Sequence, residues 1–297
     1  MSHVKHIKHA DIDFEKWDRT VLASRMPFVF AQSFYLNATC PNWDALVIGD
    51  YESIFPLTHK RKYGYSYLPQ PPFTSQLGTY GVVNEEVERV FFTYILIHYR
   101  LIEIELNVTN RLQSEFISSK NTFTIDYSIG YKFNQNTKRN IANANELGFK
   151  VEQVPNDQIL ELSKEHIDSF LLYGLNLPKE AVNLFDNLIS NGINARTIHT
   201  FKVVDKEGNI KALAHFMCNG KHALFLKGTS FDKAENTGSM HFLISFAIDY
   251  FKDKATIFDF GGGTNSQGLA GFYKGLGGEQ MNYSFLQVNR LPQLIKF

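Results

Sequence analysis

One lysine stands among glycines near the end of the sequence. Lys274 lies in the stretch GFYKGLGG at 271–278, directly after Tyr273. Glycines let a backbone approach a ligand closely, and an ammonium group stabilises negative charge that develops on a carbonyl oxygen. Lys274 is therefore a candidate for polarising a carbonyl, with Tyr273 as a substrate-binding neighbour. The alternative is a surface lysine in a glycine-rich loop.

A carboxylate ends an apolar run in the same part of the chain. Asp259 follows the run at 256–258 and precedes three glycines at 261–263. It is a candidate for orienting or deprotonating an amine. The alternative is a turn carboxylate that accepts hydrogen bonds from the glycine amides. The letters DFG do not indicate a kinase, because no glycine-rich nucleotide loop or catalytic His-Arg-Asp accompanies them.

Two further places are candidate anion sites. Lys138 and Arg139 can grip a phosphate group, although adjacent charges are also typical of a solvated helix face. Gly238 and Ser239 open an apolar helical pattern over 240–251, and free amides at a helix start favour anions. They are candidates for donor binding, with plain helix-start residues as the alternative. Neither a Rossmann nor a P-loop glycine motif occurs.

A loop in the first half is rich in amides and prolines. Gln70 and Gln76 bracket the stretch QPPFTSQ after an aromatic strand pattern. Such a loop can line a cleft, which makes both glutamines candidates for substrate binding. The prolines are equally consistent with a stiffened connection. No metal site is expected, because the histidines at positions 3, 6 and 9 lack a completing carboxylate pattern.

The composition is that of a globular protein. The chain has 297 residues, which favours two domains, and 44% of them are hydrophobic. Lys and Arg number 30 and Asp and Glu number 30, which argues against a nucleic-acid protein that works by overall charge. The two cysteines have no CxxC neighbour, so no disulfide framework is expected.

Targeting signals are not evident. The N-terminus lacks an apolar stretch typical of a signal peptide. The most apolar windows, 90–106 and 240–251, contain charged residues and fall short of a membrane span. We therefore expect a cytoplasmic protein without a membrane span.

The order of predicted elements occurs twice. Strand, helix, strand and strand patterns begin at 43, 84, 101 and 122, and similar patterns begin at 196, 237, 256 and 282. The offset stays between 153 and 160 residues, which favours a duplicated unit. Each unit is predicted as two helices, a three-stranded antiparallel meander, a helix and two strands.

This pattern predicts an α+β fold with two units. We expect each unit to have a mixed, mostly antiparallel sheet flanked by helices. The first unit is predicted over 1–130 and the second over 131–297, beginning with a polar helical segment at 131–148. One large α+β domain with coincidental spacing is the alternative.

The element order resembles the GNAT fold of acyl-CoA N-acyltransferases. Two tandem units resemble the FemAB-like acyl- and aminoacyltransferases that build peptidoglycan cross-bridges. Three segments carry the likeness: NQNTKRNI at 134–141, TIFDFGG at 256–262 and GFYKGLGG at 271–278. The long inserted helical hairpin that tRNA-using members can carry is not seen. At the GNAT phosphate-binding position, Glu235 and Met240 replace the usual cation or amide and the usual small residue.

The resemblance implies an N-acyltransferase that moves an acyl or aminoacyl group from an activated donor to an amine. The implied co-substrate is acyl-CoA or aminoacyl-tRNA, with no permanently bound cofactor. The implied partners are a small-molecule or peptide amine acceptor and, with an aminoacyl donor, tRNA. The matching lysine of the family lies at the reacting carbonyl, which implies that role for Lys274. A non-catalytic tandem-GNAT module that has lost donor binding is the alternative.

Overall fold

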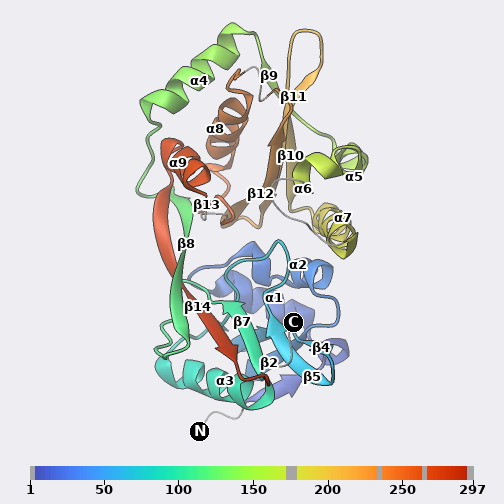
Figure 1. Cartoon of the computed structure of the whole chain (residues 1–297), viewed down its shortest axis with the longest axis vertical. Helices are drawn as coiled ribbons and strands as arrows, with labels where there is room; N and C mark the ends of the chain where they lie inside the picture. The colour runs from blue at the N-terminus through green and yellow to red at the C-terminus, as the bar shows by residue number, and fades with distance from the viewer. Residues whose placement is uncertain (1–3, 172–178, 233–235, 263–265, 293–297) are drawn as a thin grey trace. The chain divides into compact units, whose positions relative to one another are not determined.

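The computed structural model describes residues 4–171, 179–232, 236–262 and 266–292. The chain divides into two compact units (Figure 1). As far as its residues are described, unit 1 consists of Met1–Asn121 and Asn282–Phe297, and unit 2 consists of Thr122–Met281. The expected boundary after residue 130 lies within unit 2, between its first strand and its first helix.

Unit 1 contains two sets of paired strands. The first set has the order β1-β2-β3-β6, and the second has the order β4-β5-β7-β14. Within unit 1, only the β5–β7 pair among the described strands is parallel. Its elements are β1 Lys5–Ile7, α1 Phe14–Ala23, α2 Ser33–Thr39, β2 Asp44–Ile48, β3 Ser53–Leu57, β4 Lys60–Lys62, β5 Tyr65–Pro69, β6 Tyr80–Gly81, α3 Glu85–His98 and β7 Leu101–Glu105, with short 3-10 turns at His9–Asp11 and Val29–Ala31.

Unit 2 contains a single run of strands with the order β8-β13-β12-β11-β10-β9. Here too one described pair is parallel, β12 with β13, and the others are antiparallel. Its elements are α4 Gln135–Glu146, β9 Lys150–Gln153, α5 Asn156–Glu165, α6 Ile167–Leu171, α7 Lys179–Asn194, β10 Ile198–Val204, β11 Ile210–Cys218, β12 His222–Ser230, α8 Ser239–Phe251, β13 Ile257–Asp259 and α9 Gln267–Gly275.

The two halves exchange their last strands. β8, Ile117–Asp126, ends the first half of the chain, but its later residues pair with β13 of unit 2. β14, Glu279–Asn289, ends the second half, but its later residues pair with β7 of unit 1. This exchange is why the compact units do not follow the order of the chain. The α+β fold of two similar units with mixed sheets is confirmed.

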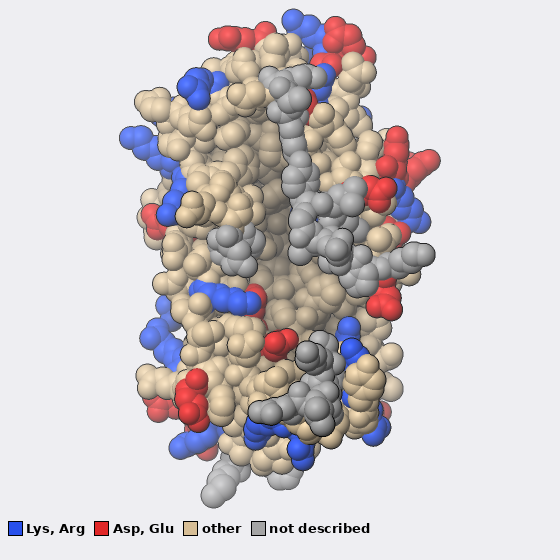
Figure 2. Space-filling model, viewed as in Figure 1, with Lys and Arg blue, Asp and Glu red and all other residues tan. Residues whose placement is uncertain are grey.

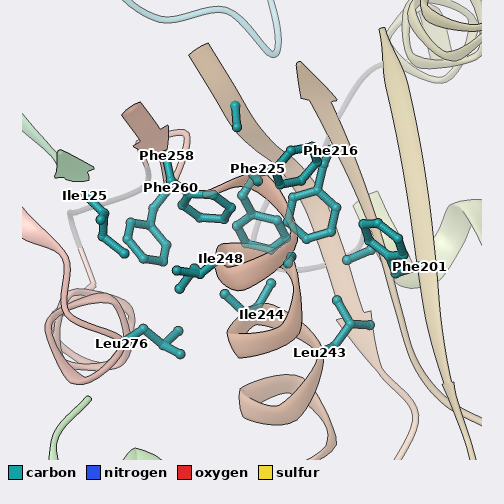
Figure 3. Close-up of a cluster of buried hydrophobic side chains, with 14 of the residues drawn as sticks. Ile125, Phe201, Phe216, Phe225, Leu243, Ile244, Ile248, Phe258, Phe260 and Leu276 are labelled. Atoms are coloured by element: carbon teal, nitrogen blue, oxygen red, sulfur yellow. The ribbon is translucent and has the colours of Figure 1, made fainter. Parts of the chain in front are cut away.

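Aromatic side chains fill the core of unit 2 (Figure 3). Helix α8 is apolar on most of its surface, and Leu243, Ile244 and Ile248 are fully buried against the sheet. Phe216 and Phe225 reach it from strands β11 and β12, with ring centroids 5.5 Å apart. Burial of such side chains is the main stabilising contribution to a fold of this kind.

Two tryptophans form the centre of unit 1. Trp17 of α1 and Trp43, which precedes β2, are fully buried, with ring centroids 4.5 Å apart. The indole N–H of Trp17 donates to the Ala31 carbonyl at 2.7 Å, so the buried donor is satisfied. Both cysteines, Cys40 and Cys218, are buried and free.

Charged side chains of both signs are interspersed on the face drawn in Figure 2, as far as its residues are described. This agrees with the equal numbers of acidic and basic residues. Among the described residues, no helix has the length and hydropathy that crossing a bilayer requires.

Candidate active site

Lys274 lies in a helix rather than in a loop. The glycine-rich segment forms α9, whose start is capped by the Ser266 hydroxyl accepting from the Leu269 amide. The residue types did not predict this helix, because glycine is a poor helix former. Tyr273 on its inner side is 4% exposed and anchors it. Lys274 occupies the last turn, where a cation is favourable.

The ammonium of Lys274 is available to a ligand. The side chain is exposed, and its Nζ lies 5.7 Å from the ring centroid of Phe123. Within the described residues it makes no ion pair. A cation over an aromatic face gains a modest attraction, which orients the side chain without neutralising its charge.

The glycine after Lys274 has a packing role. The Gly275 carbonyl accepts a hydrogen bond from the Asn134 amide at 2.9 Å. A Cβ at Gly275 would lie 3.0 Å from the Thr137 hydroxyl. The end of α9 therefore approaches the start of α4 closely, and this glycine serves contact between helices.

Tyr273 packs against two phenylalanines. Its ring centroid lies 4.7 Å from that of Phe260 and 6.1 Å from that of Phe123. Burial, and then the negative charge of Asp259, raise the pKa of Tyr273 above its usual range. The phenol therefore stays protonated at all ordinary pH values and can act only as a neutral hydrogen-bonding group.

Asp259 is enclosed by fixed donors. It is fully buried and is the last residue of β13. One carboxylate oxygen accepts from the Gly261 amide at 2.9 Å and from the Thr122 hydroxyl at 3.2 Å. The other lies 3.2 Å from Nε2 of His222. This geometry favours the alternative of a turn carboxylate, because an amine could reach the Asp259 carboxylate only by displacing one of these groups.

The structure brings Asp259, Tyr273 and Lys274 into one neighbourhood. Strand β8 supplies Thr122, which bonds to Asp259, and Phe123, whose ring lies near both Tyr273 and Lys274. Neither residue was singled out from the sequence, because the strand exchange that carries them here has no local sequence signal.

Lys138 and Arg139 lie on α4, the helix that meets the end of α9. Both side chains are exposed. The guanidinium of Arg139 donates to the Asn136 side chain at 2.8 Å. The pair lies within one turn of the helix start, capped by Asn134 accepting from the Thr137 amide at 2.8 Å. The position is consistent both with phosphate binding and with a solvated face.

Gly238 and Ser239 do begin α8, but this helix start is occupied by the protein itself. The Ser239 hydroxyl donates to Asp232 at 2.7 Å, and Thr237 and Ser230 also donate to that carboxylate. A Cβ at Gly238 would lie 2.3 Å from the Asn140 carbonyl oxygen of α4. Asp232, which was not singled out from the sequence, therefore places a carboxylate beside this helix start. Glu235 lies outside the described residues.

Gln70 and Gln76 hold the loop of unit 1 in place. The Gln70 side chain accepts from the Glu105 amide at 3.0 Å and donates to the Thr74 carbonyl at 3.1 Å. Gln76 is fully buried and accepts from the Val108 amide at 3.2 Å. These bonds attach the loop to β7 and to the segment that follows it, and they favour the alternative of a stiffened connection.

Unit 2 has the antiparallel meander β10-β11-β12, then helix α8 and strand β13 parallel to β12. In unit 1 the expected three-stranded meander is divided, because β3 pairs with β2 and β6 whereas β5 pairs with β4 and, in parallel, with β7 after helix α3. The two units together form a tandem GNAT fold. FemX shares this fold, at 13% identity and a TM-score of 0.67 over 94% of this chain and 96% of that chain. So does the C-terminal domain of a putative lysylphosphatidylglycerol synthetase from Agrobacterium fabrum, at 13% identity and a TM-score of 0.60 over 94% of this chain and 92% of that chain.

A GNAT-family acetyltransferase from Colwellia psychrerythraea is also similar, at 10% identity and a TM-score of 0.55 over 97% of this chain and 100% of that chain. No family model matches the sequence, and no curated protein matches it. The expected resemblance to FemAB-like tandem GNAT proteins is thus confirmed at the level of the fold.

Proposed function

We propose that the chain is a FemAB-like N-acyltransferase that moves an acyl or aminoacyl group from an activated donor to an amine. The observation that carries the proposal is the end of α9. There an exposed ammonium, which forms no ion pair with the described residues, follows a buried, protonated phenol. Beside them lies a carboxylate that is already fixed by three donors.

The proposed reaction needs no covalent enzyme intermediate. The amine nitrogen attacks the donor carbonyl carbon, a C–N bond forms, and the C–O or C–S bond to the leaving group breaks. The amine loses one proton and the leaving oxygen or sulfur gains one. Lys274 stabilises the negative charge on the carbonyl oxygen, and Tyr273 contributes a neutral hydrogen bond to the substrate.

Asp259 is a positioning residue in this scheme. Its hydrogen bonds with Thr122 and Gly261 hold β8 and the end of β13 together. Lys138 and Arg139 are assigned to a phosphate-bearing part of a substrate, because their helix begins against the end of α9.

The carboxylate beside the start of α8 favours one class of acyl donor over another. A carboxylate held there by Ser239 and Thr237 repels a pyrophosphate. This observation favours an aminoacyl-tRNA donor over acyl-CoA. The same observation also supports the second candidate function, which is that of a tandem-GNAT module that binds ligands without catalysis.

Calorimetry and single-turnover assays separate these functions. The full chain is titrated with acetyl-CoA, a long-chain acyl-CoA and aminoacyl-tRNA, and each donor is then mixed with a panel of amines and amino-terminal peptides. Transfer from aminoacyl-tRNA is the expected result. Binding without transfer for every donor would establish the module, and transfer from acyl-CoA alone would overturn the choice of donor.

A further inference from the structure

Unit 1 contains a cavity of about 420 Å³ that includes none of the candidate residues above. Three segments line it: the end of α1, the stretch from β6 into α3, and the segment after β7. Cavities of roughly 300–1,000 Å³ are the usual size of small-molecule sites. The cavity is therefore large enough for a small metabolite.

Two guanidinium groups line the cavity, and the charge of one of them, that of Arg111, also acts on the Glu88 carboxyl. Arg25 and Arg111 are both exposed. In the part of the chain that the structure describes, neither guanidinium has a hydrogen bond or an ion pair, and Arg111 bonds only through its backbone amide. Arginine presents a fixed fork of donors that fits a carboxylate. The two arginines can therefore bind an anionic group of a ligand.

Two carboxylates also line the cavity. Glu88 is 6% exposed, and each of its oxygens lies 3.1 Å from the Arg111 amide. Glu85, one turn earlier on α3, is exposed and also lines the cavity. One amide leaves most of the acceptor capacity of Glu88 unused. A phosphate dianion would be repelled by these carboxylates, whereas an ammonium group would be attracted.

Thr79 also lines the cavity. Thr79 is 3% exposed, and its backbone amide and carbonyl bond to the Asn110 side chain at 2.9 and 3.1 Å. Its hydroxyl makes no hydrogen bond with the described residues, so it can bond to a ligand.

The geometry points to a second binding site, in unit 1, for a small zwitterion of the α-amino acid class. The carboxylate of the ligand binds Arg25 and Arg111, the ammonium binds Glu85 and Glu88, and the Thr79 hydroxyl supplies a further hydrogen bond. This site does not depend on the proposed transferase function.

Calorimetry on the full chain tests the site. The probes are a panel of standard L-amino acids, acetate, methylammonium and inorganic phosphate. At least one amino acid is expected to bind about tenfold more tightly than acetate or methylammonium, because each of these makes only half of the charged contacts. Arg25→Gln and Arg111→Gln are each expected to weaken that binding about tenfold.

Arg89→Gln is the matched control, since Arg89 is an exposed arginine on α3 that does not line the cavity. It is expected to leave binding unchanged. Thr79→Val keeps the side-chain shape and is expected to weaken binding without loss of fold, as checked by circular dichroism. Three results would overturn the proposal: no amino acid binds, phosphate binds more tightly than any amino acid, or binding is unchanged in both Arg25→Gln and Arg111→Gln.

Discussion

At the scale of single residues, Asp44 shows how a buried charge fastens the start of the chain. It is 3% exposed. Burial opposes its charge, but hydrogen bonds from Lys8 at 2.9 Å and His6 at 2.7 Å, with one from the His9 amide, hold the pKa of Asp44 below its usual value. The carboxylate thus fixes β1 and the residues after it to β2.

Asp44→Asn is expected to lower the free energy of unfolding by roughly 1–3 kcal/mol at neutral pH, because charged hydrogen bonds are lost. The pKa is depressed in the folded state, so the stabilisation is present above the unfolded pKa of about 4 and is lost as pH falls below it. Urea unfolding at neutral pH and at pH 3 checks both parts. Asp50→Asn, at an exposed pair with Lys16, is the control and should change little.

A substitution at Tyr273 separates the chemical role of this side chain from its packing role. Tyr273→Phe keeps the ring contacts with Phe260 and Phe123, so the melting temperature is expected to stay close to that of the natural chain. The transfer rate is expected to fall about tenfold for one lost hydrogen bond. An unchanged rate would remove the phenol from the mechanism.

At the scale of elements, the contact between α4 and α8 depends on one glycine. Gly238 has φ of +83°, and an added Cβ would meet backbone of α4 at 2.3 Å. Both helices must give way if a side chain is added there.

Gly238→Ala is therefore expected to lower the free energy of unfolding by more than about 2 kcal/mol, from backbone strain plus the clash. Gly220→Ala is the matched control: its φ is +85°, but no atom lies near the added Cβ. It is expected to cost only the strain, about 1–2 kcal/mol. Equal losses for the two variants, measured by urea unfolding, would contradict the close approach of the helices.

Most helices and strands could be predicted from the sequence, but not all of the tertiary contacts that they make. The helix over 240–251 is a local signal, and it was predicted correctly. Helix α9 was missed because tertiary packing of Tyr273 overrides the low helix propensity of its glycines. The role of Asp232 was missed because its partners Thr237 and Ser239 contact it only after the chain has folded.

At the scale of the whole molecule, the exchange of β8 and β14 determines which fragments of the chain are expected to fold on their own. Unit 2 is complete only with Thr122–Asp126 of β8, and unit 1 is complete only with the later part of β14. A pattern of repeated elements predicts two units, but it cannot show which copy of a strand pairs with which sheet.

A fragment of residues 122–281 is expected to fold and to unfold cooperatively, because it contains all the strands of unit 2. A fragment of residues 131–297 is expected to aggregate or to remain partly unfolded. It lacks β8, so the edge of β13 is bare, and it carries β14 without β7. Circular dichroism with thermal melting of both fragments measures this, and the reverse order of stability would refute the exchange.

In the proposed reaction, the ammonium of Lys274 stabilises the reacting carbonyl. The most direct test of this role is the single-turnover transfer rate of Lys274→Ala, with Lys252→Ala, another exposed lysine at a helix end of unit 2, as the control. We predict a loss of about 100-fold or more for Lys274→Ala, partial recovery with Lys274→Arg, and an unchanged rate for Lys252→Ala. A Lys274→Ala protein that transfers at the full rate would contradict the claim.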